Sequence, residues 1–333
     1  MIQCNPIIAE ALDKGLLSRC KFNHLGKEKK EQIMLALAKQ YSMCYKGLQT
    51  FQRWGQSTTT GLFEKDGYEF VFIPEDVVTL GWDRFAEGFD EWNQSDIESV
   101  LKECEYEGTV TDFLKEVMSP VRTVTISPML AGRTLKSVCW EQVPMDSPYL
   151  LENKEWMAYF HKAASESKCF IIHKQVKFEQ IEGKWQAYIY HPMSYGELKD
   201  ALSKQNYSLP TADEWAYICG GGCRTIYPFG DNLDLDTMHL YYIHDLEKEN
   251  DERPYDMEEA NFFGLSIAYD PYKRELTEAL KKTTCGGDGG CYFCGGYGIV
   301  LSFLPCSPHY KSEEAEDDEL NGDYNYYRPI IRI

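Results

Sequence analysis

The segment LPTADEWAY, at positions 209–217, carries the strongest structural signal in this chain of 333 residues. Pro210 suits the first turn of a helix, because the N–H group that proline lacks would have no partner there. Asp213 and Glu214 follow near the positive end of the helix dipole, which favours negative charge. Trp215 then supplies a large apolar surface. The segment therefore predicts a helix that begins near Pro210 and is anchored in the core by Trp215.

This segment belongs to an ordered series of short motifs that extends over most of the chain. The series consists, in chain order, of FVFIP at 70–74, VTLG at 78–81, HPMSYGEL at 191–198, LPTADEWAY, YPFGD at 227–231, ANFFGL at 260–265, the glycine pair at 289–290 and YRPIIR at 327–332. In order and spacing, the series resembles the family of formylglycine-generating enzymes and sulfatase-modifying factors over about residues 65–333. The resemblance implies an α+β, C-type-lectin-like fold with little regular secondary structure.

Residues 1–60 lie outside this resemblance and show a different pattern. Apolar residues recur with helical spacing in 7–17 and again in 33–45, and a polar link around 23–30 divides the two stretches. This pattern predicts an N-terminal helical hairpin. The small polar residues QSTTTG at 56–61 offer no surface for a core, so we expect a joint there. The predicted domains are the hairpin, 1–60, and the enzyme-like domain, 61–333.

Local patterns predict further elements inside the second domain. Residues 68–80 and 121–126 alternate in the manner of half-buried strands. Residues 95–117 resemble an acidic linker helix. The acidic run at 312–319 is typical of a solvated loop.

Active members of the family oxidise a substrate cysteine to formylglycine with copper(I), which two thiolates hold in a C-x4-C arrangement. The matching stretch here is LSFLPCSPHYK at 301–311. Cys306 matches the second cysteine, but Leu301 occupies the position of the first. Copper(I) prefers soft thiolate ligands, and one alone holds it poorly. The resemblance therefore implies a pseudoenzyme that keeps the scaffold without the oxidase chemistry. Cys306 is the catalytic candidate if activity remains.

Two other departures from the family concern its calcium site and its helix entry. The family's GNVWEW segment, whose Asn helps to hold a structural calcium ion, is replaced by YDPYKREL at 269–276. The arginine that precedes LPT in the family is Ser208 here. The first change disfavours the calcium site, so we rank calcium and copper below zinc as expected cofactors.

Cysteines flanked by glycines form a separate candidate for a metal site. Cys219 and Cys223 lie in CGGGC, and Cys291 and Cys294 lie in CGGDGGCYFCGG, which begins at Cys285. Glycines let a backbone turn tightly around a metal, and two such pairs can assemble a four-thiolate zinc site. The first pair has the less usual spacing, C-x3-C. Two alternatives stay open, namely a copper or redox role and ordinary thiols of the core or loops.

Composition limits the partners and the location. The chain has 34 basic and 53 acidic residues, and its formal charge of −19 repels a nucleic-acid backbone. The first residues lack the basic and apolar regions of a secretory signal, and no run of about 18 apolar residues is present. We therefore expect a cytoplasmic protein without membrane or nucleic-acid partners, whose cysteines are mostly reduced.

These observations favour a binding or scaffold function. Loops rich in Tyr and Trp can present a surface to a protein or peptide partner, because rigid aromatic side chains lose little entropy on binding. Lectin-like folds serve this purpose in variable ligand-binding proteins of bacteria and phages. The first alternative is a copper- or other metal-dependent oxidase of the sulfatase-modifying type that uses Cys291, Cys294 or Cys306. The second is a regulatory subunit whose N-terminal hairpin docks a partner.

Overall fold

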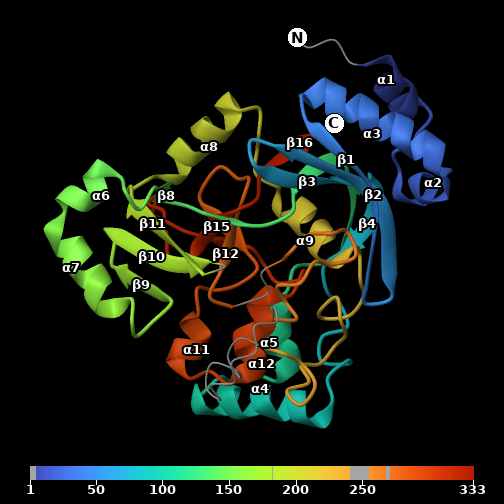
Figure 1. Cartoon of the computed structure of the whole chain (residues 1–333). Helices are drawn as coiled ribbons and strands as arrows, with labels where there is room; N and C mark the ends of the chain where they lie inside the picture. The colour runs from blue at the N-terminus through green and yellow to red at the C-terminus, as the bar shows by residue number, and fades with distance from the viewer. Residues whose placement is uncertain (1–4, 182, 241–254, 268–270) are drawn as a thin grey trace.

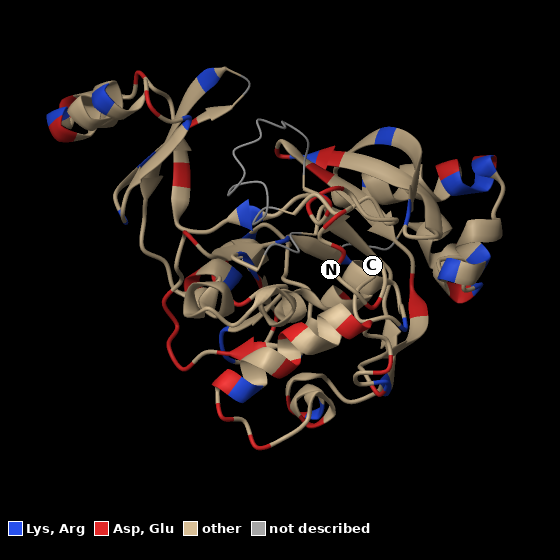
Figure 2. Ribbon diagram, turned by 90° about the horizontal axis from the view of Figure 1, so that it is seen from below, with Lys and Arg blue, Asp and Glu red and all other residues tan. Residues whose placement is uncertain are grey.

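The computed structural model describes residues 5–181, 183–240, 255–267 and 271–333, which form four sheets surrounded by helices (Figure 1). The mixed α/β class confirms the coarse prediction from the sequence. Among the helices formed by these residues, none combines the length and apolar character that crossing a membrane requires. Acidic and basic residues are both distributed over the ribbon (Figure 2).

The N-terminal region is only partly the predicted helical hairpin. Helices α1 (Pro6–Asp13), α2 (Arg19–His24) and α3 (Lys27–Tyr41) are followed by the antiparallel strands β1 (Cys44–Arg53) and β2 (Gln56–Lys65). The prediction of a hairpin over 1–60 is therefore wrong beyond residue 43. The predicted joint QSTTTG lies inside β2, and the boundary at residue 60 falls within that strand.

Turn chemistry and threonine content explain why this stretch forms strands. Trp54 and Gly55 connect β1 to β2 and both have positive φ angles, 51° and 73°, which suit a tight hairpin turn. Thr58 and Thr60 are buried, and β-branched residues favour strands. The Thr60 hydroxyl donates a hydrogen bond to the Phe72 carbonyl, 2.5 Å away, so its polar group is satisfied.

A five-stranded antiparallel sheet joins the two ends of the chain. Its order is β1-β2-β3-β6-β16, where β3 is Tyr68–Ile73, β6 is Met129–Gly132 and β16 is Ile330–Arg332. Successive side chains of a strand point to opposite faces of the sheet. One face packs with α1 and α3 through a cluster that includes Phe70, Phe72 and Leu130. The opposite face contributes Val71 and Ile73 to the main core. The N-terminal helices thus cover one face of the central sheet (Figure 1).

The next segment contains the strands predicted from sequence alternation. Strand β3 and strand β4 (Asp76–Leu80) confirm the prediction over 68–80, and β5 (Arg122–Ile126) confirms that over 121–126. Between them, the predicted linker helix is two helices, α4 (Glu91–Glu103) and α5 (Val110–Val117). The break contains Glu105 at a φ of 54°, and Thr109 then starts α5 with a capping box to Asp112.

Residues 140–190 form a lobe that the sequence analysis did not anticipate. It contains β8 (Trp140–Val143), α6 (Pro148–Glu152), α7 (Lys154–Ala163), β9 (Cys169–Ile172), β10 (Val176–Ile181) and β11 (Lys184–Tyr190). The strands pair in the order β8-β11-β10-β9. A separate apolar cluster around Trp156, Phe170 and Phe178 holds the helices on the sheet. The lobe projects from the rest of the molecule on the left of Figure 1.

The C-terminal part combines short helices with a second five-stranded sheet. The helices are α8 (Tyr195–Lys204), α9 (Ala212–Gly220), α11 (Cys291–Gly295), α12 (Ile299–Phe303) and the 3-10 turn η1 (Leu304–Cys306). The sheet has the order β14-β13-β12-β15-β7, with β7 (Lys136–Ser137), β12 (Arg274–Thr277), β13 (Thr283–Cys285), β14 (Glu313–Glu314) and β15 (Asn325–Tyr327). Strands β15 and β16 follow one another directly, so this sheet adjoins the central one.

Candidate functional site

The helix predicted from LPTADEWAY is present as α9, but it begins after the proline. Thr211 is the N-cap, and its hydroxyl accepts a hydrogen bond from the Glu214 N–H at 3.2 Å. The Glu214 carboxylate accepts the Thr211 N–H at 2.8 Å, which completes a capping box. Pro210 therefore precedes the helix, and the expectation that it occupies the first turn is wrong. The physical reason is that a threonine hydroxyl satisfies a free helical N–H better than proline can.

Trp215 of α9 is buried against a charged pair that the sequence analysis missed. The indole N–H donates to Glu275 at 3.1 Å, and Glu275 also accepts the Arg328 Nε at 3.1 Å. Arg328 is fully buried, and its remaining donors bind the carbonyls of Gly132 and Ser266. The pair joins β12 to the end of β15 beside the central sheet. A sequence signal did exist, because an arginine within the apolar segment YRPIIR requires a buried acceptor.

The single cysteine that matches the family's copper ligands is closed to solvent. Cys306 ends η1 and is fully buried in the main core, together with Leu301 of α12. Tyr227 of the YPFGD segment is also fully buried, and its ring stacks on Phe229 with centroids 4.9 Å apart. Burial raises the pKa of the Tyr227 hydroxyl well above its ordinary value, and a charge on Cys306 would raise this pKa further. Cys306 itself is fully buried and therefore offers no open position to a substrate.

The four cysteines proposed for zinc occupy different environments. Cys219 is buried in α9, and Cys223 lies 3.8 Å from the Nε2 atom of His309. Cys291 and Cys294 are exposed on α11. Within the described residues, no group of three or more His, Cys, Asp or Glu side chains is arranged to hold a metal ion. The structure therefore does not bring the four thiols together.

Burial also changes the pKa of Cys223, a member of the first pair, and of Cys285, which precedes the second pair. It raises the pKa of Cys223 to about 11, and it raises the pKa of Cys285 far above its ordinary value. A metal-bound cysteine must be a thiolate, so burial opposes metal binding at both positions.

The ANFFGL segment forms a structural turn. The Asn261 side chain donates to the Ile218 carbonyl at 2.7 Å and accepts the N–H groups of Phe263 and Leu265. The segment YDPYKREL, from which the sequence analysis argued about calcium, begins at position 269, and residues 268–270 lie outside those the structure describes.

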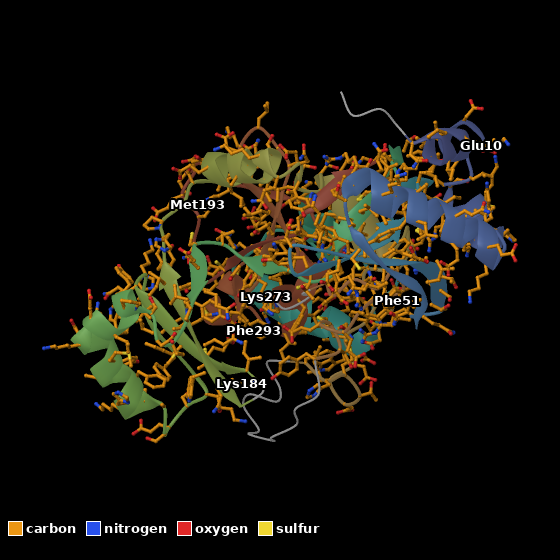
Figure 3. The ribbon with its side chains drawn as sticks, turned by 45° about the horizontal axis from the view of Figure 1, so that its top comes forward. Glu10, Phe51, Lys184, Met193, Lys273 and Phe293 are labelled. Carbon is orange, nitrogen blue, oxygen red and sulfur yellow. The ribbon has the colours of Figure 1, made fainter. Side chains whose placement is uncertain are left out.

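A cavity of 580 Å³ opens between α11 and the C-terminal acidic segment. Its walls come from the start of α11, from the second five-stranded sheet and from the β9–β10 turn, which supplies Lys174. Side chains of both charges line the cavity, and these are Lys174, Arg274, Lys282, Glu313, Glu314, Asp317 and Glu319. The exposed Cys291 and Cys294 of α11 lie in the same wall. The position of α11 can be followed in Figure 3 from its labelled residue Phe293, which lies between the lobe, on the left, and Phe51 of β1, on the right.

The acidic run at 312–319 forms part of this wall and is not simply a solvated loop. Strand β14 pairs with β13 inside the run, where Glu313 lies opposite Thr284. Lys174 binds Glu319 at 2.9 Å, and Lys282 binds Asp317. The local sequence pattern did not predict this role, because Lys174, which pairs with the run, is 145 positions away from its partner Glu319.

Arg274 lines the cavity, and the buried Asp288 directly precedes the lining residues Gly289 and Gly290. The Asp288 carboxylate accepts the N–H groups of Gly290 and Tyr292, both at 2.8 Å, and so fixes the first turn of α11. Burial raises the pKa of Asp288 and that of Glu313. The Arg274 guanidinium donates to the Asp288 carbonyl, lies 3.6 Å from Glu313 and lies 3.4 Å from the Cys291 sulfur. One guanidinium thus connects the acidic wall to an exposed thiol.

No protein-family model matches this chain, and the search of curated proteins gives no match.

Proposed function

We propose that this protein is a non-catalytic binding or scaffold module that holds a segment of a protein or peptide partner in the cavity beside α11. The observation that carries this proposal is the lining of the cavity, whose volume is 580 Å³ and whose wall contains both cations and carboxylates. A bound peptide can exchange its own charges with these ion pairs, and partly exposed pairs cost little to rearrange. We place the protein in the cytoplasm, and we expect no nucleic-acid partner because its formal charge is −19.

We also propose that the chain shares the fold of the formylglycine-generating enzymes. Three of the motifs that carry the resemblance have structural roles that support this part of the proposal. LPTADEWAY supplies a capping box and a buried indole, ANFFGL forms a turn around Asn261, and YRPIIR supplies the buried Arg328. These roles explain why a member could keep the motifs after losing the oxidase.

An exposed aromatic side chain in the cavity could anchor the bound peptide. Tyr324 lines the cavity and is 42% exposed. Aromatic side chains of this kind often carry a large share of a binding energy. Tyr149 of the lobe is 61% exposed and lies outside the cavity lining, so it is a matched control.

The test is selection of peptides from a random display library, followed by calorimetric titration of the selected peptides. We expect Tyr324→Ala to weaken their binding by about tenfold or more, which corresponds to about 1.4 kcal/mol. Tyr149→Ala should leave the affinity unchanged. Peptides that bind the Tyr324→Ala protein as tightly as the unaltered protein would contradict this placement of the site.

A second candidate function, a metal-dependent oxidase with non-standard cysteines, is favoured by the exposure of Cys291 and Cys294 on the cavity wall. The buried Cys306 could not take part without a rearrangement of the core. We expect no copper-dependent oxidation of a Cys-x-Pro-x-Arg peptide, and no change of that result with Cys306→Ser. Turnover of such a peptide, or stoichiometric copper that is lost with Cys306→Ser, would move the oxidase to first place.

A further inference from the structure

Two exposed cysteines occupy a single helical turn at the edge of the cavity. Cys291 begins α11, Cys294 lies one turn later, and both are present as exposed thiols. Gly290 before the helix and Gly296 after it have positive φ angles of 75° and 77°. Glycine adopts this conformation without strain, so the ends of the turn can adjust when the sulfurs move.

The spacing suits a disulfide bond within the turn. Residues three apart on an α-helix lie on the same face, with Cα atoms about 5 Å apart. Disulfide-bonded cysteines have Cα separations of about 4.4–6.8 Å. A bond between Cys291 and Cys294 therefore requires mainly a rotation of the side chains.

The electrostatic setting distinguishes Cys291 from the other exposed cysteines. The Arg274 guanidinium donates a hydrogen bond to its sulfur at 3.4 Å, so a fixed cation stands beside the atom that would attack. Four more cysteines are exposed in the described part of the chain, namely Cys20, Cys44, Cys104 and Cys169. None of these four lines the cavity.

We propose that Cys291 and Cys294 form a thiol–disulfide exchange site that reduces a disulfide entering the cavity. The Cys291 thiolate attacks one sulfur of the incoming disulfide, whose S–S bond breaks, and the departing thiolate takes up a proton. The Cys294 thiolate then attacks the Cys291 sulfur of the mixed disulfide and releases the second thiol. Two electrons and two protons pass from the cysteine pair to the substrate, and the pair becomes a disulfide.

This inference does not rest on the proposed peptide binding, because a small disulfide can react at an exposed thiol without any partner. The chemistry fits two sources of disulfide, a peptide or protein and a low-molecular-weight compound such as oxidised glutathione. Comparison of oxidised glutathione with a peptide that contains an internal disulfide distinguishes them. A faster reaction with the peptide identifies protein disulfides as the substrate class.

The experiment equilibrates the full chain with mixtures of reduced and oxidised glutathione, alkylates the remaining thiols and locates the modifications by mass spectrometry. We expect Cys291 and Cys294 to lose their thiols together, with a disulfide inside the peptide that carries both. Cys294→Ser should accumulate a glutathione adduct at Cys291. Cys291→Ser should form the adduct at Cys294 about tenfold more slowly, because that sulfur lacks the guanidinium.

Two controls distinguish a specific reaction at Cys291 and Cys294 from the general reactivity of exposed thiols. Cys104, exposed on another part of the surface, serves as an internal reference in every sample, and Cys104→Ser should leave the pair unaffected. Arg274→Gln should slow the attack by Cys291, and Arg274→Lys should restore it in part. Independent glutathione adducts at Cys291 and Cys294 with no bond between them, or reaction no faster than at Cys104, would overturn the proposal.

Discussion

Trp215 illustrates how one side chain connects distant parts of this molecule. Its ring is 2% exposed, and its N–H satisfies Glu275, which in turn neutralises the fully buried Arg328. Removal of any member leaves a buried polar group without its partner, which costs more than the hydrogen bond itself contributes. The residues are separated by 53 to 60 positions along the chain, so this arrangement depends on the complete fold.

Substitution Trp215→Ala should lower the free energy of unfolding by about 3–5 kcal/mol, the range for truncation of a large buried aromatic. Denaturant unfolding monitored by circular dichroism measures this loss. Trp92, which is 45% exposed on α4, is the matched control, and Trp92→Ala should change stability by less than about 0.5 kcal/mol. A Trp215→Ala protein with unaltered stability and weaker ligand binding would instead place Trp215 in a surface site.

His309 gives the protein a specific acid sensitivity. His309 is 1% exposed, its Nε2–H group donates a hydrogen bond to the Thr225 carbonyl at 3.0 Å, and its ring packs on Trp82 with centroids 5.2 Å apart. Burial lowers the pKa of His309 from 6.5 to about 4. Between these values the unfolded chain binds a proton that the folded chain does not, so stability falls as the pH falls.

The free energy of unfolding should therefore decrease by up to about 3 kcal/mol between pH 6.5 and pH 4 through His309 alone. Urea unfolding at several pH values measures the slope. His309→Gln should flatten the slope in this range, whatever its effect on overall stability. His173→Gln, which alters a side chain that is 71% exposed, should keep the slope of the unaltered protein. An identical slope in both variants would show that other groups cause the acid sensitivity.

Capping determines where the elements of this fold begin. Helices α5, α8 and α9 each start with a capping box, in which a Ser or Thr and an acidic residue satisfy each other's backbone N–H groups. The boxes of α8 and α9 lie within the segments HPMSYGEL and LPTADEWAY, whereas the box of α5 lies outside the motifs quoted from the sequence. Because a capping box joins residues only three positions apart, the start of each of these helices is determined by local sequence.

Thr211→Ala should lower the free energy of unfolding by about 1 kcal/mol, because it leaves a helical N–H without its acceptor. Thr211→Ser keeps the hydroxyl and should retain most of the stability. Chemical denaturation of both variants tests the cap. Equal losses in the two variants would mean that the methyl group, rather than the hydroxyl, provides the stabilisation.

At the scale of the whole molecule, the N-terminal helices are part of the core rather than an appendage. They cover one face of the central sheet, where Phe63, Phe70 and Leu130 are fully buried. Strand β2 pairs with β1 on one side and β3 on the other, which protects the segment where the sequence predicted a joint. The division at residue 60 would therefore cut through a continuous apolar cluster.

Removal of residues 1–43 should expose this cluster and produce an insoluble or loosely packed protein. The yield of soluble protein and the near-ultraviolet circular dichroism measure the outcome. Limited proteolysis of the full chain should also spare residues 56–65. A stable, soluble fragment that begins near residue 60 would contradict this view and restore the two-domain organisation.

The amino-acid sequence by itself determined the local features of this protein. Helical spacing of apolar residues predicted α1 and α3, and alternation of apolar and polar residues predicted β3 to β5. The start of LPTADEWAY predicted the beginning of α9 to within two residues. These features depend on interactions between residues close in sequence, so a single chain reveals them. The strands β1 and β2 escaped this reasoning because their polar, threonine-rich sequence lacks a clear apolar alternation.

Only the tertiary structure decided which chemically active residues are accessible. Cys306 is sealed in the core, whereas Cys291 and Cys294 face a cavity together with Arg274. That cavity also combines Lys174 and Glu319, which are 145 positions apart. Burial and long-range contact depend on the path of the entire chain, because each segment is covered or exposed by others that are distant in sequence. Local periodicity carries no information on that path, so residue types indicated possible chemistry while the fold decided which thiols are accessible.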